Sequence, residues 1–247
     1  MSSGDLAFVG FNADEADAFA VVTLVDIDAN TTVFFDENNW NGSSFTSSEG
    51  RAIWDSGSTT IAAGTVIRFT DFNTTASVDY GSVTESGAFN LNGSNEQLFA
   101  YLDSSSDQTP DTFLSAISNR GFSPGTDAAS TLSGTGLVEG STAVSFTGTP
   151  DIMEYMGPRS GASSFSDYLA LIGNTSNWST QDGTGDQSTD GIGPEVPFNS
   201  SSFSTYAVPE PGSALCWGML ALFGLAFGQT HVTRKRTPSG VNPSPAA

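Results

Sequence analysis

The side chains of this sequence that could do chemistry are almost all carboxylates. Of its 247 residues, 27 are Asp or Glu and only 7 are Lys or Arg. The single histidine, His231, the single cysteine, Cys216, and the single lysine, Lys235, all lie near the C-terminal end. The residues before them therefore lack the groups for a Ser-His-Asp or Cys-His mechanism, a lysine Schiff base, or a zinc site built on histidine or cysteine.

Three aspartates at four-residue intervals, Asp182, Asp186 and Asp190, lie in a glycine-containing segment. Calcium takes about 6–8 oxygen ligands, which a flexible acidic loop can supply. The segment matches neither the EF-hand loop nor a nonapeptide β-roll repeat. A calcium site at these three residues is one prediction, a solvated acidic loop is the alternative, and no other cofactor is predicted.

Pairs of carboxylates could also act without any other residue type, because a glycosidase needs only two positioned acids. In a chain this acidic, close pairs arise by chance, so we expect a protein that is not an enzyme. Three such pairs stand close in the sequence: Asp26 and Asp28, Asp36 and Glu37, and Asp151 and Glu154.

Three tryptophans precede the C-terminal region: Trp40, Trp54 and Trp178. Exposed tryptophans can stack on sugars, which would suit a carbohydrate-binding module. More commonly, tryptophans in a β domain fill its core. Both interpretations stay open from the sequence.

The charge of the chain is distributed very unevenly. Every acidic residue lies at or before Glu210, where four arginines oppose them, so residues 1–210 carry 4 − 27 = −23. A body this acidic repels nucleic acid and attracts cations. The simpler consequence is a solubilising surface.

The pattern of residues 1–198 predicts an acidic, mostly β domain. Short runs rich in β-branched and aromatic residues alternate with Gly, Ser, Asn and Asp, which is typical of a sandwich or barrel. The run at 18–25 is nearly continuously apolar, so we expect this strand to be buried on both faces. We also expect short helices at 110–117 and 166–172, and a Ser-rich linker at 199–207. The expected strands are 6–11, 18–25, 31–36, 52–55, 66–70, 97–102, 142–146 and 151–155.

The C-terminal region has three features in a fixed order. Pro209-Glu210-Pro211 comes first, an apolar segment follows, and a basic cluster, Arg234-Lys235-Arg236, comes last. The apolar segment carries large side chains on every face of a helix, which favours burial in lipid over a single apolar stripe. We therefore predict one transmembrane helix at 213–232, with a buried C-terminal helix as the alternative, and a disordered tail at 237–247. The basic cluster is expected to keep its end of the helix inside the cell.

Residues 208–236 resemble the PEP-CTERM sorting signal of exosortase substrates. In that family the signal is read by the exosortase, a membrane-embedded cysteine protease or transpeptidase that is thought to cut near Pro-Glu-Pro. The resemblance implies a sorting motif at Pro209, Glu210 and Pro211 and a stop-transfer cluster at Arg234, Lys235 and Arg236. It also implies the exosortase as a partner, transient residence in the inner membrane, and release to the cell surface or extracellular matrix. The tail at 237–247 departs from the family, whose members usually end soon after the basic cluster.

The body is also similar to a recurrent secreted bacterial β module. The resemblance implies an immunoglobulin-like, sandwich-type extracellular domain of the lamin-tail kind, without catalytic residues. The matching residues are 4–12 (GDLAFVGFN), 33–40 (VFFDENNW), Glu49-Gly50, Trp54, 61–66 (IAAGTV), 96–101 (EQLFAY) and Asn177-Trp178.

The first residues have no basic start, and the apolar run at 6–11 is too short for a signal peptide. Because exosortase substrates carry such a signal, we expect an in-frame extension upstream of Met1. The sequence thus predicts an exported, non-enzymatic surface or exopolysaccharide-matrix protein without a nucleic-acid partner. The alternatives are a calcium- or carbohydrate-binding adhesion module and a carboxylate-based glycosidase.

Overall fold

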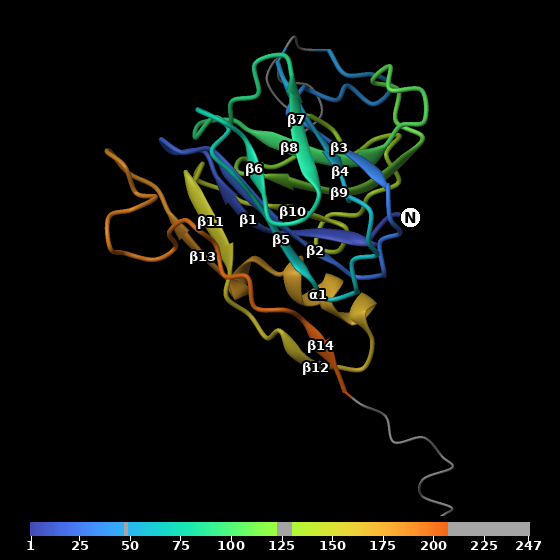
Figure 1. Ribbon diagram of the computed structural model, residues 1–247. Coiled ribbons are helices and arrows are strands. Elements are labelled where there is room, and N and C mark those ends of the chain that lie inside the picture. Colours follow the sequence, from blue (N-terminus) through green and yellow to red (C-terminus); the bar gives the residue numbers. More distant parts are fainter. Residues whose placement is uncertain (47–48, 123–129, 207–247) are drawn as a thin grey trace, which may run out of the picture. The chain divides into compact units, whose positions relative to one another are not determined.

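A computed structural model describes residues 1–46, 49–122 and 130–206, and Met1–Tyr206 form one compact unit (Figure 1). The sorting motif, the predicted transmembrane helix at 213–232, the basic cluster and the tail at 237–247 lie outside the described residues. None of the helices in the described part is long and apolar enough to cross a membrane.

Two six-stranded sheets make up this unit, so the predicted mostly β fold is confirmed, and the arrangement is consistent with a sandwich (Figure 1). Within these two sheets neighbouring strands are antiparallel, except that β10 runs parallel to β9. The first sheet has the order β13 (Trp178–Gln181), β11 (Ile152–Tyr155), β1 (Leu6–Asn12), β2 (Ala18–Thr23), β5 (Val66–Thr70) and β6 (Ser77–Val78). The second has the order β10 (Ala143–Ser145), β9 (Thr112–Ser118), β8 (Gln97–Leu102), β3 (Thr32–Asp36), β4 (Arg51–Asp55) and β7 (Ser82–Ser86).

An aromatic core joins the two sheets. The ring of Phe19 on β2 lies 4.7 Å from that of Phe35 on β3, and Trp54 on β4 meets Phe69 on β5 edge-on at 5.9 Å. All four side chains are fully buried. Burying one such side chain is worth about 1.5–3 kcal/mol, and each ring pair adds about 0.5–1.5 kcal/mol. The apolar positions that alternate along these strands therefore hold the sheets together.

The outer face of the first sheet is covered as well. β1 and β2 are buried at every position, as expected for the continuous apolar run at 18–25. Residues 192–206, which we call the strap, run along this outer face. The ring of Phe198 packs on Gly10, and the backbone carbonyl of Phe198 accepts a hydrogen bond from Arg68. A Cβ atom on Gly10 would lie 2.7 Å from that ring, so only glycine allows the approach.

The strap corrects the predicted linker at 199–207. Through Tyr206 these residues belong to the domain: Phe203 is 3% exposed, and β14 (Ser204–Thr205) pairs with β12 (Ser160–Ala162). The guanidinium of Arg159 donates to the carbonyls of Asn199 and Ser201. Serine-rich composition suggested a linker, but the buried phenylalanines and the main-chain bonds fix the segment to the sheet.

A second aromatic cluster covers the outer face of the second sheet. It contains Phe34, Trp40, Phe99 and Tyr101, and residues of neighbouring loops pack against it. Trp40 is 6% exposed and donates from its indole nitrogen to the Ser133 carbonyl. Because Trp54 and Trp178 are also buried, at 0% and 9% exposure, the three tryptophans of the described residues fill core positions.

Most predicted strands are found, but the helix predicted at 110–117 is wrong. β9 occupies Thr112–Ser118 and pairs with β8. Phe113 faces the outer aromatic cluster while Leu114 faces the inter-sheet core, so burial on both faces selects a strand there. The helix predicted at 166–172 is found in part: α1 covers Tyr168–Ile172 and follows a 3-10 turn at Phe165–Asp167.

Candidate functional site

Two of the three aspartates predicted to bind calcium, Asp186 and Asp190, are engaged with their own loop. Asp186 accepts bonds from the amide and hydroxyl of Ser188 and from Thr189, and these bonds lower its pKa. Asp190 accepts the amide of Ile192 at 2.8 Å. Within the described residues, no group of three or more His, Cys, Asp or Glu side chains could hold a metal ion. The calcium site therefore stays a prediction.

Asp182 instead faces acids from other segments. Burial raises the pKa of Asp151, which precedes β11, and the nearby charges of Asp182 and Asp14 raise it further. The backbone amide of Gln187 donates to Asp14. The Gln187 side chain is 6% exposed, and its oxygen has no hydrogen-bond donor in the described part of the chain. The loop at 182–190 thus brings acids and the unpaired side-chain oxygen of Gln187 to one end of the first sheet.

The carboxylate pairs considered for a glycosidase do not frame a cleft. Asp36 and Glu37 are 0% and 2% exposed, so no substrate reaches them. Asp36 accepts the hydroxyl of Tyr101 at 2.9 Å, and Glu37 accepts a backbone amide at Gly50. Their hydrogen bonds are structural.

The other two pairs lie in different surroundings. Asp26 and Asp28 are exposed on either side of buried Ile27. Glu154 is 7% exposed and accepts the amide of Asn199 in the strap at 2.6 Å, while Asp151 belongs to the acidic sheet end described above.

A buried carboxylate cluster, consisting of Asp17, Glu37 and Glu96, was not predicted from the sequence. These side chains are 2%, 2% and 6% exposed and come from three separate loops at the ends of β2, β3 and β8. They accept the amides of three consecutive residues: Leu91 bonds to Asp17 at 2.9 Å, Asn90 to Glu37 at 3.0 Å, and Asn92 to Glu96 at 2.9 Å. The only signal in the sequence is that each acid borders a strand, which many other acids also do.

Burial sets the electrostatics of this carboxylate cluster. It raises the pKa of Asp17 to about 6, that of Glu37 to about 8 and that of Glu96 to about 9. The acids also repel one another, because Glu37 acts on Glu96 and Asp17 acts on Glu37. The backbone amides partly oppose both effects. The two glutamates therefore hold protons at neutral pH.

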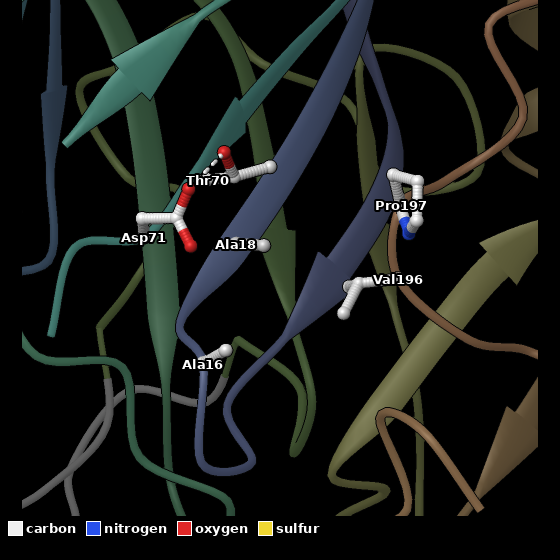
Figure 2. A pocket seen from close by; sticks show the side chains of 6 residues that line it. All are labelled: Ala16, Ala18, Thr70, Asp71, Val196 and Pro197. Atoms are coloured by element: carbon white, nitrogen blue, oxygen red, sulfur yellow. Dashed lines mark hydrogen bonds between the residues drawn. The ribbon is translucent and has the colours of Figure 1, made fainter. Parts of the chain in front are cut away.

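Two hollows of the described domain border the strap. One, of about 210 Å³, lies between the strap and the ends of β2 and β5, and Figure 2 shows the small alanine side chains that leave it open. Its two oxygen-bearing side chains, Thr70 and Asp71, are hydrogen-bonded to each other at 2.9 Å. Its lining is Ala16, Ala18, Thr70, Asp71, Val196 and Pro197.

A larger hollow of about 450 Å³ also borders the strap. Glu154 and Glu195 supply its carboxylates, and Met156, which is 61% exposed, supplies an apolar wall. Glu154 is bound to Asn199 and Glu195 to the amide of Gly191. Both acids thus have structural partners.

The buried carboxylates of the described domain therefore bind its own backbone. The arrangement can hold protons in its interior and attract cations to its surface. Comparisons of the chain with protein-family models, with curated proteins and with solved structures gave no match.

Proposed function

We propose that this chain is the precursor of an exported, non-enzymatic cell-surface or exopolysaccharide-matrix protein that an exosortase sorts through its C-terminal signal. The observation that carries the proposal is the order of three sequence features: Pro209-Glu210-Pro211, the uncharged apolar segment, and Arg234-Lys235-Arg236. In this proposal the β domain is an immunoglobulin-like extracellular module. The apolar segment spans the inner membrane until the precursor is processed.

The position of the domain boundary supports this proposal. The last paired residue of the strap, Thr205, precedes Pro209 by 209 − 205 = 4 positions. A cut near Glu210 would leave the whole strap, with its buried Phe198 and Phe203, in the released protein. Processing at this point would therefore preserve the folded domain.

The chemistry of the domain supports a function other than catalysis. Residues 1–206 contain no histidine, lysine or cysteine. The most buried acids, among them Asp36, Glu37 and Glu96, accept hydrogen bonds from the protein itself. An acidic exterior with a fixed interior suits a soluble matrix component, and the net charge keeps such a protein dispersed.

The charge asymmetry of the chain supports the orientation. Lys and Arg favour the cytoplasmic side of a membrane helix, so the basic cluster would stay inside while the acidic domain lies outside. An orientation with the domain inside would leave Arg234-Lys235-Arg236 on the wrong side.

The test is the intact mass and membrane fraction of the tagged full-length protein, expressed in a host with and without its exosortase. We expect wild type to lose its C-terminal residues only when the exosortase is present, and Glu210→Ala to accumulate uncleaved in the membrane. Glu85→Ala, which changes an exposed acid on β7, is the matched control and should be processed like wild type. If wild type and Glu210→Ala both keep the full C-terminus, the segment is a plain anchor.

A second candidate function is calcium binding at the acidic end of the first sheet. The observation that favours it is the buried oxygen of Gln187, which lacks a donor among the described residues and belongs to the loop that contains Asp182. Calcium accepts amide oxygens and water as well as carboxylates. Such binding would suit an adhesion module that uses the same C-terminal signal.

A further inference from the structure

Residues 89–92 form a segment that we call the seal, because its apolar side chains close one end of the inter-sheet core. Phe89 and Leu91 are 4% and 3% exposed. The ring of Phe89 lies 4.5 Å from Phe72 and 6.2 Å from Phe19. If the seal opened, these aromatic rings would meet water.

The backbone of the seal is hydrogen-bonded to the carboxylate cluster. The amides of residues 90, 91 and 92 donate to Glu37, Asp17 and Glu96, each from a different loop. Glu37 uses the same oxygen to bind the amide of Gly50, so it joins two loops at once. Three carboxyl groups thus fasten three consecutive peptide units.

The seal is also closely fitted. A Cβ atom on Gly50 would lie 2.2 Å from the nitrogen of Phe89, so the two backbones are in direct contact. Asn119 donates to the carbonyls of Asn92 and Gly93 and accepts the amide of Glu96. The seal therefore has one well-defined closed position.

Among the described residues, the charged groups that act most strongly on the cluster are acids. Glu85 on β7 acts on Asp17, and Glu49 acts on both Glu37 and Glu96. The cluster members also act on one another, since Glu37 acts on Glu96 and Asp17 acts on Glu37. Like charges this deeply buried cannot all ionise, so a closed seal requires that protons be retained.

We propose that the carboxylate cluster is an alkali-sensitive latch, which holds the seal shut while it keeps its protons and releases the seal when it loses them. Full ionisation would put three negative charges near one another in a buried site. Moving the seal away would let water reach those charges and relieve the repulsion. Opening would then expose the rings of Phe19 and Phe72, so that a rise in pH would create an aromatic patch on the surface.

The direction of the response follows from the burial of the acids. Their pKa values in the closed state, about 6, 8 and 9, lie above those of exposed carboxyls, so opening releases protons. Rising pH therefore favours the open seal. The effect begins in mildly acidic solution and is complete above about pH 9.

The test is amide hydrogen exchange of the full-length protein between pH 5 and pH 10, with rates corrected for intrinsic exchange at each pH. We expect the amides of residues 90–92 to lose protection as pH rises, while those of β1 stay more strongly protected at every pH because they exchange only through global unfolding. Glu37→Gln keeps an oxygen acceptor without the charge, so at pH 9 it should protect these amides at least about tenfold better than wild type, equivalent to one pK unit. Asp17→Asn should act in the same direction and serves as the second variant if Glu37→Gln does not fold.

Glu154→Gln is the matched control, because Glu154 is also buried and also holds a backbone amide, that of Asn199. It should leave the exchange of residues 90–92 unchanged. Equal protection of these amides at pH 6 and pH 9 in wild type would overturn the proposal. So would protection in β1 as low as that of residues 90–92 at high pH, which would mean that these amides exchange by global unfolding, or wild-type behaviour of both cluster variants.

Discussion

The acids of the loop at 182–190 and those of the carboxylate cluster carry the same carboxyl group in opposite surroundings. Asp186 is bound by hydroxyl and amide donors of its own exposed loop, which lower its pKa. Glu96 is buried beside Glu37, and burial raises its pKa to about 9. The formal charge of −23 for residues 1–210 counts both kinds alike. The comparison teaches that charge counted from composition overstates the charge carried by the folded domain at neutral pH.

The largest effect that would sharpen this contrast is the pH dependence of stability. Because folding raises the pKa of Glu37 and Glu96 from about 4.5 to about 8 and 9, their stabilising contribution is complete below pH 4.5 and is lost as pH rises through 8 to 9. We expect the free energy of unfolding to fall by roughly 3–6 kcal/mol between pH 5 and pH 9. Urea unfolding at several pH values measures this change. Glu37→Gln should flatten the curve, and an unchanged slope would show that other acids cause it.

Truncating one acid of each kind gives the next largest effect. Glu96→Ala leaves the amides of Asn92 and Gln97 without their acceptor, so we expect it to lower the free energy of unfolding by roughly 2–4 kcal/mol. Asp186→Ala removes an exposed side chain whose bonds stay within its own loop, so it should lower the unfolding midpoint much less. Denaturant midpoints at pH 6 compare the two variants. Equal losses would break the contrast between buried and exposed acids.

Calcium should produce the smallest effect, because only the exposed acids can respond to it. Millimolar calcium should raise the melting temperature by about 2–4 °C through screening, with or without a specific site. If the loop at 182–190 binds calcium, the rise will exceed that from magnesium. Replacing Asp182, Asp186 and Asp190 together by Asn should then remove the excess. An equal response of the wild type to both ions would leave screening as the whole effect.

The β strands were largely predictable because their signals are local. The continuous apolar run at 18–25 predicted a strand buried on both faces, and β2 is buried at all of its positions. β7 was not predicted, since Ser82, Thr84, Glu85 and Ser86 give it a polar, exposed character. It is recognisable only through its pairing with β4.

The site-level predictions depended on which residues meet in space, and spacing along the chain was a poor guide to that. Regular four-residue spacing singled out Asp182, Asp186 and Asp190, whereas the fold sets Asp182 near Asp151 and Asp14. The cluster at Asp17, Glu37 and Glu96 joins residues up to 96 − 17 = 79 positions apart. No periodicity in the sequence reveals that these three acids lie together, because their contact depends on how the loops at the ends of the two sheets pack.

The strap also determines how the domain would respond to a mechanical load. Any pull on the C-terminal side reaches Tyr206 first and then the short pairing of β14 with β12. It next reaches Phe203, whose ring lies 5.2 Å from the guanidinium of Arg159, and only later Phe198 on the surface of β1. Force would thus peel the strap residue by residue before it reached the hydrogen bonds between β1 and β2. The strap would act as a sacrificial element that yields at low force and leaves the pairing of the two sheets unloaded.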